Sequence, residues 1–221
     1  MPQKAYPEKG RRTQEERRRE TTQKLIDATV SAVNAHGFGG LKASQITKRA
    51  GVTWGAVQHL FGDKEALLLA VASRTYEELS AALNSESSEC ASIEECVEQI
   101  VAVTWKAYQS EAYLAMVEIL RGSRANKVFH QELVDRQQAL NDGVRQNWLN
   151  WFAHTDLDEG TIDNARDLVT ISLSGLAARY IFLRTDKESK PLLSTLCQAT
   201  VSVLQQSSGQ MNRQRRLTVM V

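Results

Sequence analysis

The chain has 221 residues, 42% hydrophobic and 24% charged, with only three prolines and a net charge of +1. Length and composition exclude a peptide that needs covalent staples and match an ordinary soluble protein of one or two domains, and the shortage of proline favours an all-α fold. Residues 1–64 hold 12 Lys and Arg against 6 Asp and Glu, and residues 65–221 hold 15 against 20, so the first third is the part expected to meet a polyanion.

The N-terminal segment divides into an arm and the start of a folded head. Residues 1–12 lack periodicity and are interpreted as a flexible N-terminal arm. A head is predicted over residues 13–62, where Thr13 and Glu16 form a capping box and apolar residues then recur every three or four positions. Gly37 is expected to stop this first helix.

Two short helices follow, separated by a turn. Apolar spacing predicts one helix over residues 43–50, Gly51 supplies the left-handed residue of a tight turn, and Thr53 is placed to cap a helix that ends at Gly62. A helix of about seven residues, a glycine-containing turn and a helix of about nine residues are the spacing of a helix-turn-helix motif. The second helix of such a motif enters the major groove of DNA.

A longer helical body is predicted over residues 63–206. Asp63 caps a linking helix, and the amphipathic stripes beyond it indicate a bundle of long antiparallel helices, the last two over residues 162–183 and 191–204. Because the first of these two is apolar nearly all round, we expect the pair to be covered by a second copy of itself in an isologous four-helix interface of a homodimer. Burial inside a monomer core is the alternative. Residues 207–221 are interpreted as a C-terminal tail.

The third helix carries side chains that are unusual for a solvated surface. Trp54, Gln58 and His59 stand where Glu and Lys would be common. Gln can pair with base edges, and Trp and His can pack or hydrogen-bond at sugar and phosphate. Lys64, at a helix N-terminus, is placed to hold a phosphate. The alternatives are that Trp54 packs onto the head's own helices and that His59 and Lys64 are only solvated.

Residues 37–67 resemble the DNA-binding region of the TetR family of bacterial transcriptional regulators. The matching positions are Gly37, Phe38, Ile46, Ala50, Gly51, Val52, Thr53, Gly55, Phe61, Lys64 and Leu67. The resemblance implies a homodimer whose body binds a small molecule and so changes the spacing of its two DNA-binding heads. It departs from the family pattern at Gln58, where Tyr is common, and at Lys42, where Ser or Thr usually caps the helix. The predicted DNA-contacting residues are Lys42, Ser44, Thr53, Trp54, Gly55, Gln58, His59 and Lys64.

The body is rich in aromatic residues on helical stripes. They are interpreted as the wall of a mostly apolar effector pocket, with a plain core as the alternative for each residue. The predicted effector-binding residues are Trp105, Tyr108, Tyr113, Met116, Trp148, Phe152 and Arg179. Arg179 lies within an apolar helix, and a buried arginine needs an anionic partner. That partner is an acid such as Glu118 or an anionic ligand, unless Arg179 lies at the dimer edge.

The cysteines and the apolar segments of the sequence do not form any further recognisable motif. Cys90, Cys96 and Cys197 are odd in number and form no CxxC, so neither a disulfide framework nor a metal site is indicated, and no cofactor is predicted. The N-terminus has no apolar leader, and the longest apolar stretch, of about 16 residues, is interrupted by Arg179. We therefore expect a cytoplasmic protein without a membrane partner, associated with the nucleoid when it binds DNA.

Together these patterns predict a sequence-specific transcriptional regulator. The leading hypothesis is a repressor that binds double-stranded DNA at a pseudo-palindromic operator and is released by a small-molecule effector. The alternative is an architectural DNA-binding protein without ligand control. Catalysis is not expected, because the four histidines are scattered and neither HExxH nor GxSxG occurs.

Overall fold

The computed structural model describes residues 13–85, 90–183 and 189–218. Its elements there are helical: α1 (Gln14–Gly40), α2 (Ala43–Ala50), α3 (Trp54–Phe61), α4 (Lys64–Ser85), α5 (Ile93–Tyr108), α6 (Glu111–Gly122), the 3₁₀ helix η1 (Ser123–Ala125), α7 (Lys127–Trp151), α8 (Glu159–Leu183) and α9 (Ser189–Thr218). The predicted all-α fold is confirmed. The predicted arm, residues 1–12, lies outside the described residues.

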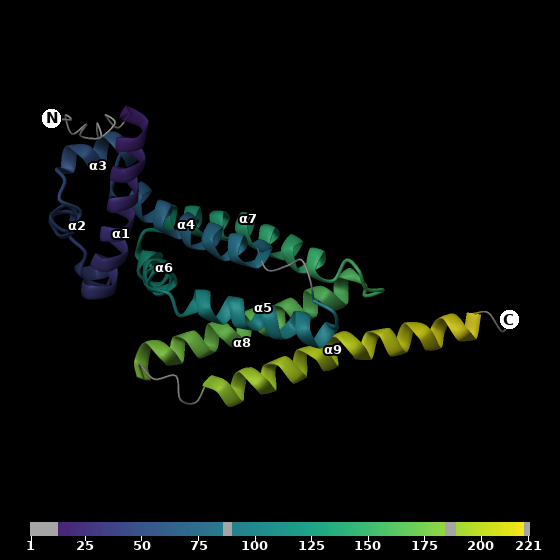
Figure 1. Cartoon of the computed structure of the whole chain (residues 1–221). Helices are drawn as coiled ribbons and strands as arrows, with labels where there is room; N and C mark the ends of the chain where they lie inside the picture. Colours follow the sequence, from purple (N-terminus) through teal and green to yellow (C-terminus); the bar gives the residue numbers. More distant parts are fainter. Residues whose placement is uncertain (1–12, 86–89, 184–188, 219–221) are drawn as a thin grey trace, which may run out of the picture.

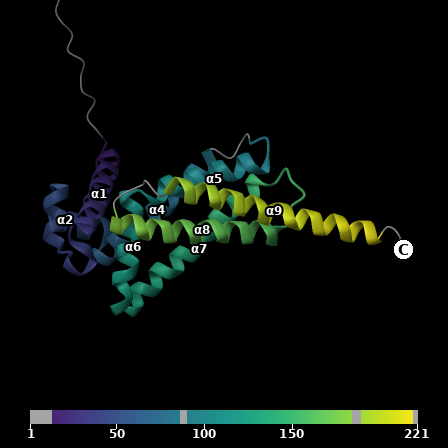
Figure 2. The same ribbon diagram turned by 90° about the horizontal axis from the view of Figure 1, so that it is seen from below.

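Figure 1 shows two parts, a head made by α1, α2 and α3 at one end and an elongated body made by α4 to α9. Helix α4 leaves the head and runs beside α7, and α8 and α9 lie side by side along the body. The same pairing of α8 with α9 is visible when the molecule is turned, and the far end of α9 projects past the other helices (Figure 2). Among the described residues, no helix has both the length and the apolar content needed to cross a membrane.

Local sequence rules explain most of the helix ends. Thr13 Oγ1 accepts a hydrogen bond from the Glu16 N–H at 3.2 Å, and a Glu16 carboxylate oxygen accepts one from the Thr13 N–H at 2.7 Å. The regular part of α1 stops at Gly37, whose φ of 66° and ψ of 168° are not helical. Gly51 ends α2 with φ 67°, the left-handed conformation that glycine adopts without a steric cost. Asp63 caps α4, because its Oδ1 accepts from the Ala66 N–H at 2.8 Å.

Three predictions about local structure were wrong. Thr53 occupies the N-cap position of α3, but its side chain makes no capping hydrogen bond. Helix α9 continues to Thr218 and does not end near Leu204, because the Gln, Met, Arg and Leu residues of this segment have a high intrinsic preference for helix. Cys90 and Cys96 form a disulfide, since the turn that begins α5 brings their Cα atoms to 5.2 Å.

The head is joined to the body mainly by the packing of α1 on α6. The Phe38 N–H donates to Glu118 Oε1 at 3.1 Å, and the Phe38 ring stacks on Phe129 of α7 with 6.3 Å between centroids. Earlier in α1, the Asn34 side chain donates to the Glu111 backbone oxygen at 2.9 Å. The end of α1 is therefore held directly against α6.

Candidate DNA-binding surface and effector pocket

The helix-turn-helix is held by two fully buried side chains, Ile46 of α2 and Val57 of α3. With these residues turned inward, the opposite faces of the two helices are left to solvent. Six of the eight predicted DNA-contacting residues are exposed there, namely Lys42, Ser44, Thr53, Gly55, Gln58 and His59. The structure thus presents these six residues together on one end of the molecule, although their role in DNA binding stays a prediction.

Trp54 and Lys64 are placed differently. Trp54 is half-buried and packs against the core of the head, as the alternative interpretation had it. Lys64 is also half-buried, and its Nζ lies 3.5 Å from the Leu41 carbonyl oxygen. The ammonium therefore helps to close the end of α1 onto α4, so a substitution at Lys64 would alter the fold of the head as well as any phosphate contact.

Two structural details account for Lys42 and Thr53. Lys42 stands where Ser or Thr usually caps the helix, and here Gln45 provides a capping bond of α2. Its Oε1 accepts from the Lys42 N–H at 2.7 Å. The Lys42 side chain is therefore not needed for capping. The Thr53 hydroxyl is likewise exposed and not engaged in the cap of α3.

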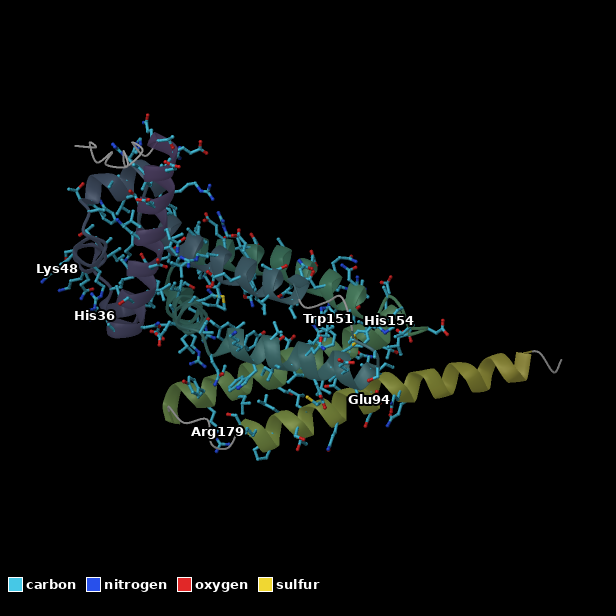
Figure 3. All side chains as sticks on the ribbon, viewed as in Figure 1. His36, Lys48, Glu94, Trp151, His154 and Arg179 are labelled. Carbon is cyan, nitrogen blue, oxygen red and sulfur yellow. A yellow bond between two sulfur atoms is a disulfide. The ribbon has the colours of Figure 1, made fainter. Side chains whose placement is uncertain are left out.

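Sequence reasoning missed two cations at the other end of α2. Lys48 and Arg49 are both exposed in its last turn, and Arg49 Nη2 lies 3.2 Å from His36 Nε2. Figure 3 shows Lys48 and His36 at the outer edge of the head. Because the first helix of such a motif crosses the DNA backbone, basic residues on its solvent side were a signal that could have been used.

A cavity of about 170 Å³ lies in the body between α4, α5, α7 and α8. Tyr108 and Trp148, two of the predicted effector-binding residues, are among those that line it, and their role in effector binding stays a prediction. The other lining residues are Tyr76, Leu79, Leu83, Thr104, Asn141, Asp142, Val144, Arg145, Arg166, Asp167, Val169 and Thr170. The sequence did not identify these, because the side of each helix that faces the cavity depends on how four helices cross.

Four of the other predicted pocket residues are buried but do not line the cavity. Tyr113 stacks on Tyr108 with 4.1 Å between ring centroids, and Phe152 lies against Trp148 at 6.1 Å. Trp105 meets Tyr180 edge to face, and Met116 is buried in α6. None of these four is among the residues that line the cavity.

The polar groups of the cavity differ in charge state. Burial raises the pKa of Tyr76 and of Tyr108 far above the usual value for a phenol, and it also raises the pKa of Tyr113. These phenols are therefore neutral at physiological pH and can donate or accept hydrogen bonds. At the edge of the cavity, Arg145 pairs with Asp163 at 2.9 Å and with Glu159 at 2.8 Å, and Arg166 pairs with Asp163 at 2.8 Å.

Of the alternatives for Arg179, a place at the dimer edge stays open, because this residue is not buried within the chain. Arg179 is exposed, and so are Ile171 and Gly175, which lie two turns and one turn before it on the same face of α8. Figure 3 shows Arg179 at the outer side of the body. The apolar sequence of α8 is thus not fully covered by this chain, and its outward face carries Ile171 with 71% of its surface exposed.

These features together define an all-helical DNA-binding transcriptional regulator of the helix-turn-helix class. More narrowly, residues 25–71 match the family model of the tetR family of bacterial regulatory proteins. This match covers the end of the first helix, the whole helix-turn-helix and the start of α4.

Curated relatives agree with this assignment. The chain is 24% identical over 189 residues to the HTH-type transcriptional regulator CymR of Pseudomonas putida, a match that covers 80% of this chain and 87% of CymR. It is 50% identical over 46 residues to the regulator BetI of Serratia proteamaculans, a match that covers 21% of this chain and 23% of BetI. The second likeness is thus confined to a short segment.

Solved structures share the fold across the body as well. A transcriptional regulator from Rhodococcus has a TM-score of 0.67 at 18% identity, covering 83% of this chain and 96% of that one. The regulator FadR from Bacillus subtilis, solved in complex with stearoyl-CoA, has a TM-score of 0.65 at 17% identity and covers 82% of this chain and 98% of that one.

Proposed function

We propose that this regulator is a sequence-specific repressor that a small-molecule effector releases from its operator. The observation that carries the proposal is one chain that combines an exposed polar face on α3 with a cavity between four body helices. Tyr113 of α6 stacks on Tyr108 of the cavity wall, and the junction of α6 with α1 continues this contact to the head. In this scheme the effector-free dimer holds its two DNA-binding heads at a spacing that fits the operator. The effector binds better to a conformation in which the heads are spaced differently.

The operator contacts come from the two helices of the motif. Gln58 and His59 are proposed to meet base edges or sugar, while Lys42, Ser44 and Thr53 meet phosphates. Gly55 allows close approach of the backbone, and Trp54 and Lys64 position α3 in addition to any contact of their own. Lys48 and Arg49 are added to the phosphate-contacting set because both are exposed on α2.

The protein is further proposed to act as a homodimer through α8 and α9, in the cytoplasm and on the nucleoid when bound to DNA. Ile171 of α8 and Leu192 of α9 are exposed by 71% and 44%, which leaves an apolar surface that a second copy would cover. Two heads on such a dimer would read half-sites about 34–36 Å apart if one turn of DNA separates them.

DNA binding is tested with the duplex upstream of the protein's own gene, against a shuffled duplex, at several salt concentrations. We expect Gln58→Ala to lower the affinity for the specific duplex by about fivefold to a hundredfold, since the variant has no amide to pair with a base edge. Lys42→Ala should weaken binding to both duplexes and make the salt dependence shallower by about 0.9 for each phosphate that is no longer neutralised. Fluorescence anisotropy measures both quantities.

Lys106→Ala is the matched control, because Lys106 is an exposed lysine on α5, outside the head. It should leave both affinities and the salt dependence unchanged. Equal binding of the wild type to the specific and the shuffled duplex would exclude a sequence-specific operator in this DNA and favour the architectural alternative.

The effector is proposed to be compact, mostly apolar and equipped with a hydrogen-bonding group. A volume of about 170 Å³ is below the range of pockets that hold drug-sized ligands, and the neutral phenols of Tyr76 and Tyr108 are two of the polar groups that line it. FadR from Bacillus subtilis binds stearoyl-CoA, but the cavity of this chain is suited to a much smaller molecule.

Filling the cavity should block the effector while it spares DNA binding. In a panel of compact aromatic acids, alcohols and amines plus stearoyl-CoA, we expect a compact member to release the labelled operator. Val144→Phe, inside the cavity, should raise the concentration needed for release at least about tenfold. Val128→Phe, on the same helix but exposed, should not. Release by stearoyl-CoA alone would contradict a compact effector.

A further inference from the structure

Three metal-ligating side chains meet at the end of the body that lies far from the DNA-binding head. They are Cys90, just before α5, Cys96 in the first turns of α5, and His154, which follows α7. One ligand atom from each lies within 4.8 Å of the others. Figure 3 shows His154 beside Trp151 at this end. The effector cavity and the exposed face of α3 do not include any of them.

The local fold fixes the two cysteines. Ser92 caps α5 by accepting from the Glu95 N–H at 3.2 Å, and the Glu95 carboxylate accepts from the Ala91 N–H at 2.8 Å. These two bonds hold the turn in which Cys90 returns toward the helix, with 5.2 Å between its Cα and that of Cys96. The cluster is therefore built into the start of α5.

The third side chain is brought in by the end of α7. The indole N–H of Trp151 donates to the Leu83 carbonyl oxygen of α4 at 3.0 Å, and the Trp151 carbonyl oxygen lies 4.0 Å from Cys96 Sγ. His154 follows three residues later in a hydrogen-bonded turn, where the Thr155 N–H donates to the Phe152 oxygen at 2.9 Å. The end of α7 thus brings one imidazole to the two sulfur atoms at the start of α5.

The chemistry of this set selects a thiophilic cation. Two thiolates and one imidazole are the ligands that Zn²⁺ takes in proteins, and hard ions such as Mg²⁺ and Ca²⁺ need oxygen ligands that this set lacks. Cys96 is fully buried while His154 is exposed, so one side of the set faces solvent. We propose that Cys90 and Cys96 in their reduced form, together with His154, bind one Zn²⁺ per chain, with water as the fourth ligand.

Binding competes with the disulfide of the same two cysteines. A cellular dithiol breaks the Cys90–Cys96 bond by giving two electrons and two protons, so that two protein thiols form and the dithiol becomes a disulfide. Zn²⁺ then displaces both thiol protons into solvent and binds the two thiolates. The metal site and the disulfide are therefore two exclusive states of one cluster, separate from the proposed effector cavity.

The test uses the full chain, reduced with a phosphine that ends as phosphine oxide with an oxygen from water, and then freed of reductant without air. Co²⁺ is the spectroscopic probe, because thiolate ligation gives a near-ultraviolet charge-transfer band, and Zn²⁺ is titrated against a chromogenic chelator. We expect one equivalent of metal per chain. Cys90→Ser and Cys96→Ser should each weaken Zn²⁺ binding by about a hundredfold or more, and His154→Ala by about tenfold to a hundredfold.

Two control variants separate the cluster from unspecific binding. Cys197→Ser removes the half-buried thiol of α9, and His130→Ala removes an imidazole whose Nδ1 bonds Ser123 Oγ at 2.7 Å. Both should bind Zn²⁺ like the wild type. Cys90→Ser is the decisive variant, because a change at a half-buried side chain disturbs the fold less than one at the fully buried Cys96. Circular dichroism verifies that the Cys90→Ser protein keeps its helix content.

Several results would overturn the proposal. One is an absent cobalt–thiolate band in fully reduced protein. Another is a Cys90–Cys96 bond that the phosphine does not reduce, because the two cysteines would then form only a structural disulfide. Unchanged binding in His154→Ala would remove the imidazole from the site, and loss of binding in Cys197→Ser would move the site elsewhere. None of these results depends on whether the chain binds DNA.

Discussion

Gly122→Ala is expected to destabilise the protein by about 1–3 kcal/mol and to loosen the junction between head and body. A Cβ added at Gly122 would lie 2.4 Å from the Cβ, Cγ and Cδ1 atoms of Phe38. Phe38 has little freedom to yield, because its ring stacks on Phe129 and its N–H is bonded to Glu118. The end of α6 and the end of α1 would therefore have to separate.

Urea unfolding of the purified variant measures this cost. Gly143→Ala is the matched control, because the added Cβ would lie within 4 Å of no atom besides its chain neighbours and the backbone of its own helix, α7. It should be neutral or stabilise the protein by up to about 1 kcal/mol through helix propensity. If the two variants are equally stable, the contact of Phe38 with Gly122 is not the tight joint that its geometry indicates.

The same variant bears on how the effector reaches the DNA-binding head. If α6 carries the signal to Phe38, a displaced junction should weaken the coupling between effector and DNA, seen as a smaller change in DNA affinity on adding the effector. If the variant loses stability but keeps normal coupling, the signal does not pass through α6. It would then pass through α4, which also links head and body.

Signals that act within a few residues could be predicted from the sequence. The capping box of Thr13, the left-handed Gly51 and the cap by Asp63 each depend on neighbours along the chain, and the structure has all three. The helix-turn-helix could be predicted for the same reason, because its spacing and its turn are local. These features are enough to locate the candidate DNA-binding surface on the head, even when the fold of the body is unknown.

Features that depend on the crossing of distant helices could not be predicted. Tyr108 and Trp148 were assigned to the cavity, but Tyr76 and Arg145 line it as well, and the stripes of α4 and α7 alone do not reveal this. For Arg179, whose neighbours are apolar, the sequence left open both burial beside an anionic partner and a place at the dimer edge. The exposure of Arg179 shows that an apolar helix can be left open when the chain alone does not cover it.

The cysteine cluster escaped prediction for a related reason. Cys90 and Cys96 are separated by six positions, which is neither a CxxC nor a full helical repeat. Only the reversal of the chain at the Ser92 cap brings them together, and His154 joins them from the end of another helix. A search by motif spacing does not detect such a turn.

Ile171→Arg is expected to convert the proposed dimer to monomers. Burying an isoleucine side chain contributes about 1.5–3 kcal/mol, and an isologous interface contains Ile171 twice. The variant removes both apolar side chains and places two added cations on a face where Arg179 is already exposed. We expect the dimer dissociation constant to rise by about a hundredfold or more, measured by sedimentation over a range of concentrations.

Operator affinity should fall together with dimerisation, because a monomer binds one half-site without the second head of a linked pair. Val128→Arg is the control, since Val128 is 72% exposed against 71% for Ile171 but lies in the first turn of α7. It should remain dimeric and bind the operator like the wild type. If Val128→Arg dissociates and Ile171→Arg does not, the interface lies on α7, and the open face of α8 must serve another partner.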